Sequence, residues 1–161
     1  MNRENNNGVI YLTRERLVEL EKELHHLKLH GRAEIAQKIH DARSYGDLTE
    51  NAEYDAAKEA QQHLEMKIAK LQETISRARI IERKNFPNDK VYILSTVTLK
   101  DLKNDEVVIY TLVSPEEANY EENKISITSP FGKGLLGKTR GEKIKITVPA
   151  GTLEYEILEI S

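Results

Sequence analysis

The sequence of 161 residues contains no cysteine and no tryptophan, and its four prolines all lie after residue 86. Without cysteine the chain can form neither a disulfide nor a thiolate metal site, which is typical of proteins in a reducing compartment. No apolar run approaches the roughly 20 residues that span a bilayer, and the polar residues 1–7 lack the apolar core of a signal peptide. We therefore expect a soluble, cytoplasmic protein that does not bind a membrane.

Neither positive nor negative charge dominates the sequence. The chain has 24 Lys and Arg against 27 Asp and Glu, a formal net charge of -3. Proteins that hold free duplex DNA through its phosphates need a dominant basic surface, so this balance argues against that class. The sequence also lacks a glycine-rich phosphate loop or dinucleotide fingerprint. No cysteine or histidine-paired serine offers a nucleophile for covalent catalysis.

The first half of the chain has helical periodicity and no proline. Thr13 predicts an N-cap, and a leucine at every third or fourth position then marks a helix packed along a partner. Gly31 lowers local helicity by about 1 kcal/mol relative to Ala and predicts a kink. The apolar positions of this segment are Leu17, Leu20, Leu24 and Leu27 before the glycine, and Ile35, Ile39 and Ala42, on a shifted face, after it.

A second helical segment is predicted from about Thr49 to Arg83. Helices of about 30 residues would each extend roughly 45 Å, so residues 1–84 are predicted to form an antiparallel α-helical coiled-coil hairpin whose tip is the turn at Gly46. Small residues near the turn and larger ones farther away suit helices that approach closely at the tip. The apolar stripe of the second segment comprises Ala57, Ala60, Leu64, Ile68, Leu71, Ile75, Ala78 and Ile81.

The periodicity changes after residues 85–89, which contain Pro87 and mark a domain boundary. Beyond them the apolar residues alternate, as in β-strands. Ser129 as a cap, Pro130 at the first helical position and Gly137 beyond the end predict one short helix. The fold class is therefore α+β with two domains, the second being a small antiparallel β-sheet domain over residues 85–161. Its strands are predicted at residues 96–99, 106–113, 124–127, 142–148 and 153–158.

The hairpin tip carries two carboxylates, Asp47 and Glu50. Their spacing is that of a capping box, with Thr49 as an alternative cap, and spacing alone favours capping. The other interpretation is half of a metal site, because Mg²⁺ prefers oxygen ligands and takes only one or two protein carboxylates. Two carboxylates cannot hold Mg²⁺ tightly, so another macromolecule would have to supply the remaining ligands.

Two pairs of residues flank the tip. Arg43 and Lys58 are either ordinary surface charges or guides for a phosphate chain. Tyr45 and Tyr54 are expected to pack the end of the hairpin, and stacking on a nucleobase is the weaker alternative.

His26 and His30 have the spacing of two metal ligands on one helical face. No carboxylate or cysteine is placed to complete a tetrahedral set. We therefore predict an ordinary solvated face at these histidines.

Two motifs resemble the Gre family of bacterial transcript cleavage factors. The first is Asp41–Tyr54, which reads DARSYGDLTENAEY. The second is Ser129–Lys138, together with the closing residues 149–158. The resemblance covers nearly the whole chain from Tyr11, in the right order and spacing, and it favours a functional role for the tip over capping alone.

The resemblance implies that the coiled coil enters the secondary channel of bacterial RNA polymerase while an FKBP-like C-terminal domain docks at the channel rim. When polymerase has backtracked, the RNA 3′ end lies in that channel. Asp47 and Glu50 would then help to hold a second Mg²⁺ shared with the polymerase and orient the attacking water, as in two-metal phosphodiester hydrolysis. The protein would be a monomer with no cofactor in isolation, and not an enzyme on its own.

The resemblance also assigns roles around these two residues. Arg43 and Lys58 would guide the RNA, and the absence of a large basic cluster predicts short cleavage products. The tip would be supported by Tyr45, Gly46, Asn51 and Tyr54. The polymerase would be contacted by Ser129, Pro130, Gly134 and Leu135, although the same loop could merely cap its domain.

Three alternatives stay open at this point. An inhibitor could use the same rod only to plug the channel, although such relatives alter the tip. The C-terminal domain could be a peptidyl-prolyl isomerase, although only Phe86 and Phe131 are available as phenylalanines to line a proline pocket. A purely structural coiled-coil adaptor would not need the tip carboxylates.

Overall fold

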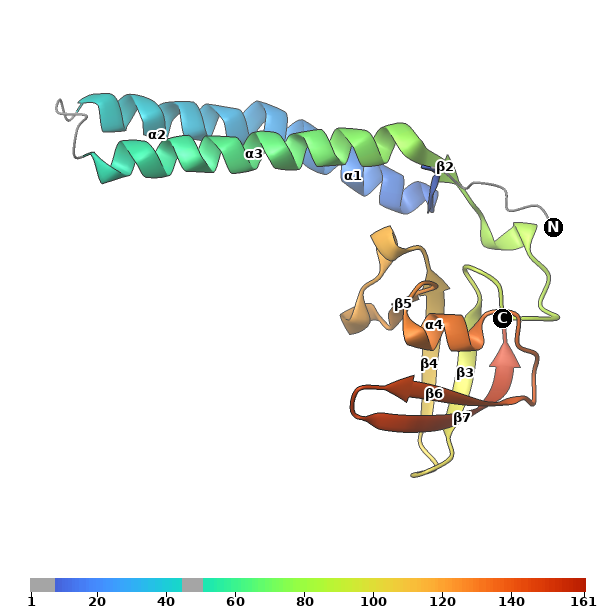
Figure 1. Cartoon of the computed structure of the whole chain (residues 1–161). Helices are drawn as coiled ribbons and strands as arrows, with labels where there is room; N and C mark the ends of the chain where they lie inside the picture. The colour runs from blue at the N-terminus through green and yellow to red at the C-terminus, as the bar shows by residue number, and fades with distance from the viewer. Residues whose placement is uncertain (1–7, 45–50) are drawn as a thin grey trace. The chain divides into compact units, whose positions relative to one another are not determined.

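The structure is a computed structural model that describes residues 8–44 and 51–161 (Figure 1). The chain forms two compact units. Within the described ranges, one comprises Gly8, Val9 and Arg14–Ala78, and the other comprises Ile10–Thr13 with Arg79–Ser161. The predicted boundary after residue 84 lies a few residues beyond this division. Among the described residues, no helix is both long and apolar enough to cross a membrane.

The first unit is a helical hairpin. Its helices are α1 (Arg14–His26), α2 (Arg32–Ser44) and α3 (Ala52–Arg77). Both α1 and α2 pack along α3, with α2 and α3 side by side (Figure 1). Leu20, Ala42, Ala57 and Ile68 are buried, so the apolar stripes face each other as the periodicity predicts. The predicted helical hairpin is confirmed.

A π-helical turn, Leu27–Gly31, separates α1 from α2 at the predicted kink. Such a turn contains more residues per turn than an α-helix, which rotates the following apolar face. A Cβ on Gly31 would lie 3.1 Å from Leu64 Cδ1, so the glycine lets this leucine approach the backbone. The next residue, Arg32, forms a bidentate ion pair with Glu65 of α3, and both N–O distances are 2.9 Å. The hydrogen bonds from Arg32 lower the pKa of Glu65.

The prediction that the second helix continues to Arg83 is wrong. Helix α3 ends at Arg77, and β2 (Ala78–Ile80) pairs with β1 (Ile10–Leu12) in a two-stranded sheet. Ala78 and Ile81 continue the helical spacing of apolar residues, so periodicity alone could not reveal the change. Thr13 directly precedes α1, and its N–H and hydroxyl both donate to the Glu117 carboxylate, at 3.0 and 2.5 Å.

The second unit contains a five-stranded sheet of order β5-β4-β3-β7-β6. The predicted strands are confirmed with small shifts at their ends, and the sheet curls so that β6 and β7 run across β3 and β4 (Figure 1). The predicted antiparallel pairing holds for three of the four pairs of neighbouring strands, while β5 pairs in parallel with β4. Two 3-10 turns between β4 and β5 reverse the chain twice. The strands are β3 (Thr96–Asp101), β4 (Val107–Val113), β5 (Lys124–Ser126), β6 (Lys143–Val148) and β7 (Gly151–Ile160).

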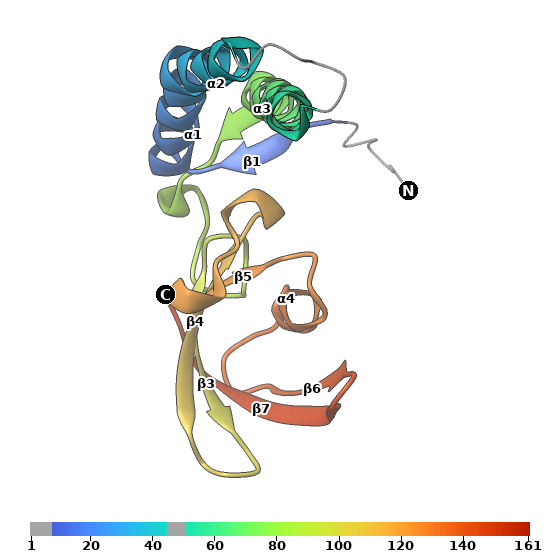
Figure 2. The ribbon, with the colours of Figure 1, turned by 90° about the vertical axis from the view of Figure 1, so that its left-hand side faces the viewer.

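The core of this unit lies between the sheet and α4 (Pro130–Leu135), the predicted short helix. Alternate residues of the strands point inward, such as Val97 and Leu99 in β3, which are fully buried. Helix α4 lies in the angle of the curled sheet (Figure 2). A Cβ on Gly132 would lie only 2.1 Å from the backbone oxygen of Ser126, so this position needs glycine for the close approach.

We expect Gly132→Ala to lower the free energy of unfolding of the C-terminal unit by about 1–3 kcal/mol, because the added methyl forces α4 away from the Ser126 backbone. Chemical denaturation followed by circular dichroism measures this. Lys133→Ala on the same helix is the control, since Lys133 is exposed. An unchanged stability for Gly132→Ala would contradict the packing of α4 described above.

Candidate functional site at the hairpin tip

The predicted catalytic and metal-binding residues, Asp47 and Glu50, lie outside the described residues, as do Tyr45, Gly46 and Thr49. The structure does describe the two helix ends that flank them. Helix α2 ends at Ser44 and helix α3 begins at Ala52. The site is therefore built from these ends.

The N-cap of α3 is Asn51, so the prediction that Asp47 or Thr49 caps this helix is wrong. The Asn51 side-chain oxygen accepts a hydrogen bond from the Tyr54 N–H at 3.1 Å. The correction follows from where the helix begins: Asp55 N–H already donates to the Asn51 carbonyl, so the free N–H groups at the start of α3 are those of residues 52–54, within reach of the Asn51 side chain. Asp47 and Glu50 are therefore not needed as N-cap residues of α3.

Asn51 also contacts the other helix. Its side-chain nitrogen donates to the Ala42 carbonyl in the last turn of α2, at 2.6 Å. Nearby, the Arg43 guanidinium lies over the Tyr54 ring, 5.8 Å from its centroid. A cation over an aromatic face is attracted by the ring quadrupole. Two contacts thus join the end of α2 to the start of α3.

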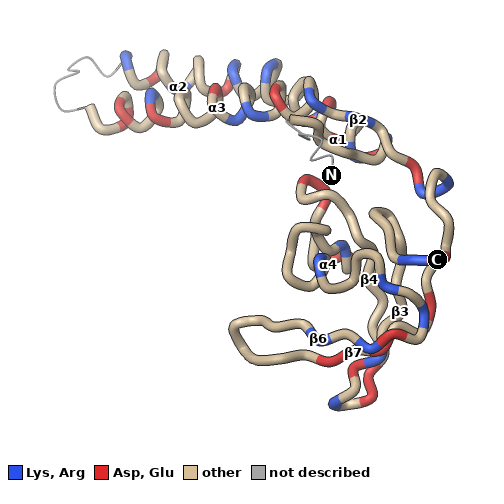
Figure 3. Tube along the Cα trace, turned by 45° about the vertical axis from the view of Figure 1, so that its right-hand side comes forward, with Lys and Arg blue, Asp and Glu red and all other residues tan. Residues whose placement is uncertain are grey.

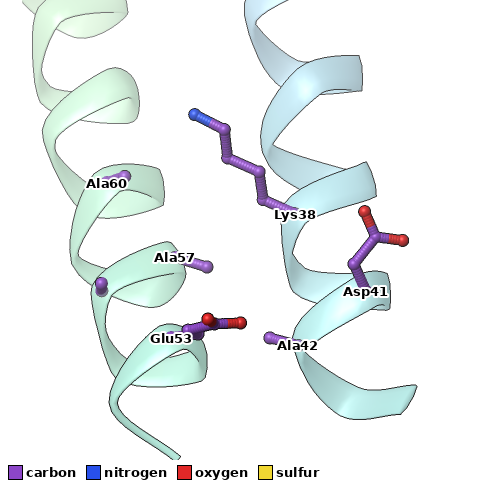
Figure 4. Close-up of a pocket in the computed structure, with 7 residues that line it drawn as sticks. Lys38, Asp41, Ala42, Glu53, Ala57 and Ala60 are labelled. Atoms are coloured by element: carbon purple, nitrogen blue, oxygen red, sulfur yellow. The ribbon is translucent and has the colours of Figure 1, made fainter. Parts of the chain in front are cut away.

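A groove of about 390 Å³ runs between α2 and α3 next to this end (Figure 4). Most of its lining residues are alanines, and their small side chains leave space between the two packed helices. Ala42 and Glu53 point toward one another across the groove, and Lys38 extends toward α3. The groove is lined by Lys38, Asp41, Ala42, Glu53, Ala56, Ala57 and Ala60.

Both predicted RNA-guiding residues are exposed on the hairpin. Arg43 lies in the last turn of α2, while Lys58 lies on α3 and donates to Gln61 at 2.9 Å. Basic and acidic residues are interspersed along the described helices (Figure 3). The described hairpin therefore offers single cations near the tip and not a continuous basic stripe, and the guiding role stays a prediction.

The predicted solvated face at His26 and His30 agrees with the structure. Both side chains are exposed and their ring centroids lie 5.0 Å apart. Over residues 8–44 and 51–161 there is no group of three or more metal-ligating side chains.

The predicted docking loop has a clear structural role in its own unit. The Ser129 hydroxyl accepts from the Gly132 N–H at 3.0 Å and donates to the Ser126 carbonyl at 2.7 Å, so it caps α4. Leu135 is fully buried in the core, which contradicts a contact between its side chain and a partner. Pro130 is exposed, and a partner could reach it.

An isomerase-like proline pocket finds no support among the described residues. Phe131 packs edge-on against both Tyr110 and Tyr155, with ring centroids 5.3 and 5.2 Å away. A separate hollow of about 310 Å³ in this unit has no aromatic lining. It is lined by Asp101, Leu102, Lys103, Thr152, Leu153 and Glu154.

The sequence did not lead us to predict the structural roles of two side chains, Asn51 and Glu117. Asn51 was expected only to support the tip, although an asparagine just before a helix is a strong cap signal. The bond between Glu117 and Thr13 joins residues 104 positions apart, and no local pattern predicts it.

Comparison with known proteins gives matches along most of the chain. The family model described as "Transcription elongation factor, N-terminal" matches residues 10–80, and the one described as "Transcription elongation factor, GreA/GreB, C-term" matches residues 86–161. Transcription elongation factor GreA of Amoebophilus asiaticus is 54% identical over 95% of this chain and 98% of its own length. The factor of the same name from Flavobacterium johnsoniae is also 54% identical, over 95% of this chain and 97% of its own length.

A solved structure of GreA factor homolog 1 from Thermus thermophilus is 28% identical, covers 95% of this chain and 99% of its own, and has a TM-score of 0.44. A GreA/GreB factor from Nitrosomonas europaea is 23% identical, covers 95% and 98% of the two chains, and has a TM-score of 0.43. Family membership is established by the sequence matches alone.

We expect Asn51→Ala to lower the free energy of unfolding of the hairpin by about 1 kcal/mol, because the first turn of α3 loses its cap. Thr49→Ala should leave stability within about 0.5 kcal/mol, since α3 begins beyond it. Thermal unfolding followed at 222 nm compares the two variants. A larger loss for Thr49→Ala than for Asn51→Ala would contradict the assignment of the cap.

Proposed function

Because the chain belongs to the GreA/GreB family of transcription elongation factors, we propose that it enters the secondary channel of bacterial RNA polymerase and stimulates cleavage of backtracked RNA. The observation that carries the proposal is the position of Asp47 and Glu50 between the ends of two long helices. Helix α3 alone has 26 residues, which corresponds to roughly 39 Å at 1.5 Å per residue. A rod of this length can carry two carboxylates into a narrow pore.

The donor set at the tip fits Mg²⁺. Asp47 and Glu50 provide carboxylate oxygens, which are the ligands that Mg²⁺ prefers, and the helix cap is provided separately by Asn51. Two carboxylates are too few for tight binding by the free protein, so the polymerase active site completes the coordination. When bound by Asp47 and Glu50 together with the polymerase, the shared ion would supply water activation and charge stabilisation to phosphodiester hydrolysis.

Each residue of the tip has a limited task. Asp47 and Glu50 bind the ion and orient the attacking water, and Arg43 and Lys58 hold the phosphates of the extruded RNA. The Arg43 side chain rests over Tyr54, which leaves the outer edge of its guanidinium to donate hydrogen bonds. In this proposal the chain is not an enzyme on its own, because the bond-breaking activity belongs to the polymerase.

The C-terminal unit docks on the polymerase at the rim of the channel. Pro130 is the exposed member of the candidate docking residues and marks the surface of this contact. Ser129 and Gly134 act through the backbone shape of the loop, because Ser129 caps α4 and Gly134 packs against Ile146. A docked unit would keep the hairpin in place during cleavage.

Channel plugging without cleavage is the competing function for the same fold. A plug needs only the volume of the rod, and acidic side chains at its end would add nothing to it. The presence of both Asp47 and Glu50 therefore supports cleavage.

We predict that Asp47→Asn combined with Glu50→Gln abolishes stimulated RNA cleavage, with a loss of at least about 100-fold. Neutral amides keep the size of the side chains but bind Mg²⁺ far more weakly. The measurement is the shortening of labelled RNA in backtracked polymerase complexes. Polymerase binding and the melting temperature should stay as in the unaltered protein.

The matched control is Asp41→Asn combined with Glu53→Gln, which removes two negative charges from the flanking helices. Both residues are exposed beside the tip, and this variant should retain cleavage. If the tip variant cleaves at the normal rate, or if both variants lose cleavage equally, a specific role for Asp47 and Glu50 is refuted.

A further inference from the structure

The apolar positions of the first arm of the hairpin, residues 14–44, contain one residue too many for a regular coiled-coil seam. Up to Leu27 they alternate steps of three and four residues, as heptad packing requires. From Leu27 onward, Gly31, Ile35 and Ile39 follow in three successive steps of four. Alternating steps of four, three and four would use one residue fewer. In an unbroken helix, one extra residue turns every later side chain by about 100° around the axis.

The π-helical turn lies where this extra residue enters. The Arg32 N–H donates to the Leu27 carbonyl, five residues back, whereas an α-helical bond would reach four residues back. The turn thus uses one more residue than an α-helical turn before α2 begins at Arg32. It returns the later apolar positions to the side that faces α3, which agrees with the burial of Ala42 near the end of α2.

The second arm needs no such turn. Helix α3 runs from Ala52 to Arg77 as one α-helix. Its Leu64 packs against Gly31 of the π-helical turn, and its Glu65 accepts both hydrogen bonds from Arg32. The irregular part of the first arm is therefore held against a regular helix.

One residue of the turn lies outside the packing between the arms. Leu29 points to solvent, with 56% of its surface exposed, while Gly31 faces Leu64. Removal of Leu29 would therefore take no side chain out of the seam. It would also leave Leu27 four residues before Arg32, so that the same N–H and carbonyl would form an ordinary α-helical bond.

We infer that the π-helical turn is a register adapter: it absorbs one residue of the first arm, so that α1 and α2 present the same side to the uninterrupted helix α3. Removal of Leu29 then joins α1 and α2 into one continuous α-helix and leaves the rotation of α2 about its own axis unchanged. A residue removed from α3 finds no such turn to absorb the change. The inference concerns the build of the hairpin and does not depend on the proposed function.

The test compares two single-residue deletions, that of Leu29 in the first arm and that of Met66 in α3. Both residues are apolar and exposed, at 56% and 63%, so neither deletion removes a core side chain. Thermal unfolding of the full chain is followed at 222 nm. We expect the chain without Leu29 to melt at or above the temperature of the unaltered protein. The chain without Met66 should melt at least about 5 °C lower, because part of α3 turns its apolar stripe away from the first arm.

The second measurement determines whether α2 keeps its rotation. Because the chain has no native cysteine, spin labels can be attached to cysteines introduced at Ala36 in α2 and Gln62 in α3, both of which are exposed. The distance distribution between the labels should be the same with and without Leu29. A rotation of α2 by about 100° would shift this distribution, because the label at position 36 would move around the helix.

Leu29→Ala is the substitution control, since it shortens the same side chain and keeps the number of residues. It should match the unaltered protein in both measurements. A loss of stability in Leu29→Ala would overturn the inference, because the outward residue would then be part of the packing.

The deletions can contradict the inference in three further ways. If the chain without Leu29 melts as low as the chain without Met66, the turn absorbs nothing. If it melts normally but the label distances shift, α2 has taken another register. If both deletions are tolerated equally, the hairpin absorbs a lost residue anywhere and the π-helical turn has no special role.

Discussion

The structure depends on two helices keeping one alignment along their length. A pair of helices presents a defined tip only when their ends meet at a fixed separation, and burial of an apolar stripe alone permits some sliding. Two contacts at the π-helical turn reinforce this stripe. Leu64 packs close to Gly31, and Arg32 forms a bidentate ion pair with Glu65. At the far end, Asn51 joins α3 to the Ala42 carbonyl of α2. Between these points the groove is lined largely by alanines, which add little lateral restraint.

The cap at the start of α3 bears on the role of the two carboxylates at the tip. Because Asn51 provides the N-cap of α3, this cap does not depend on Asp47 or Glu50, and in the function proposed above the two carboxylates act as metal ligands. Two oxygen ligands bind Mg²⁺ too weakly to act alone. In the function proposed above, this weakness confines the ion to the complex with polymerase, so the factor completes an active site only where a stalled transcript is present.

Much of the fold was predictable because periodicity reports burial directly. The leucine and alanine stripes gave the hairpin, and alternation in residues such as Val97 and Leu99 gave the strands. The parallel pairing of β5 was not predictable, since pairing partners are chosen by the whole sheet. Three cap-competent residues, Asp47, Thr49 and Asn51, precede α3, and the third is used because α3 begins at Ala52, directly after it. The predicted docking motif does not reveal which of its side chains enter the core of the C-terminal unit, and Leu135 is fully buried there.

The most direct test follows RNA labelled at its 5′ end in a backtracked bacterial polymerase complex supplied with the unaltered protein and Mg²⁺. We predict that the labelled RNA becomes shorter by a short 3′ fragment and that nucleotide addition then resumes from the new end. A labelled RNA of unchanged length, together with slower nucleotide addition, would contradict cleavage and identify the hairpin as a plug.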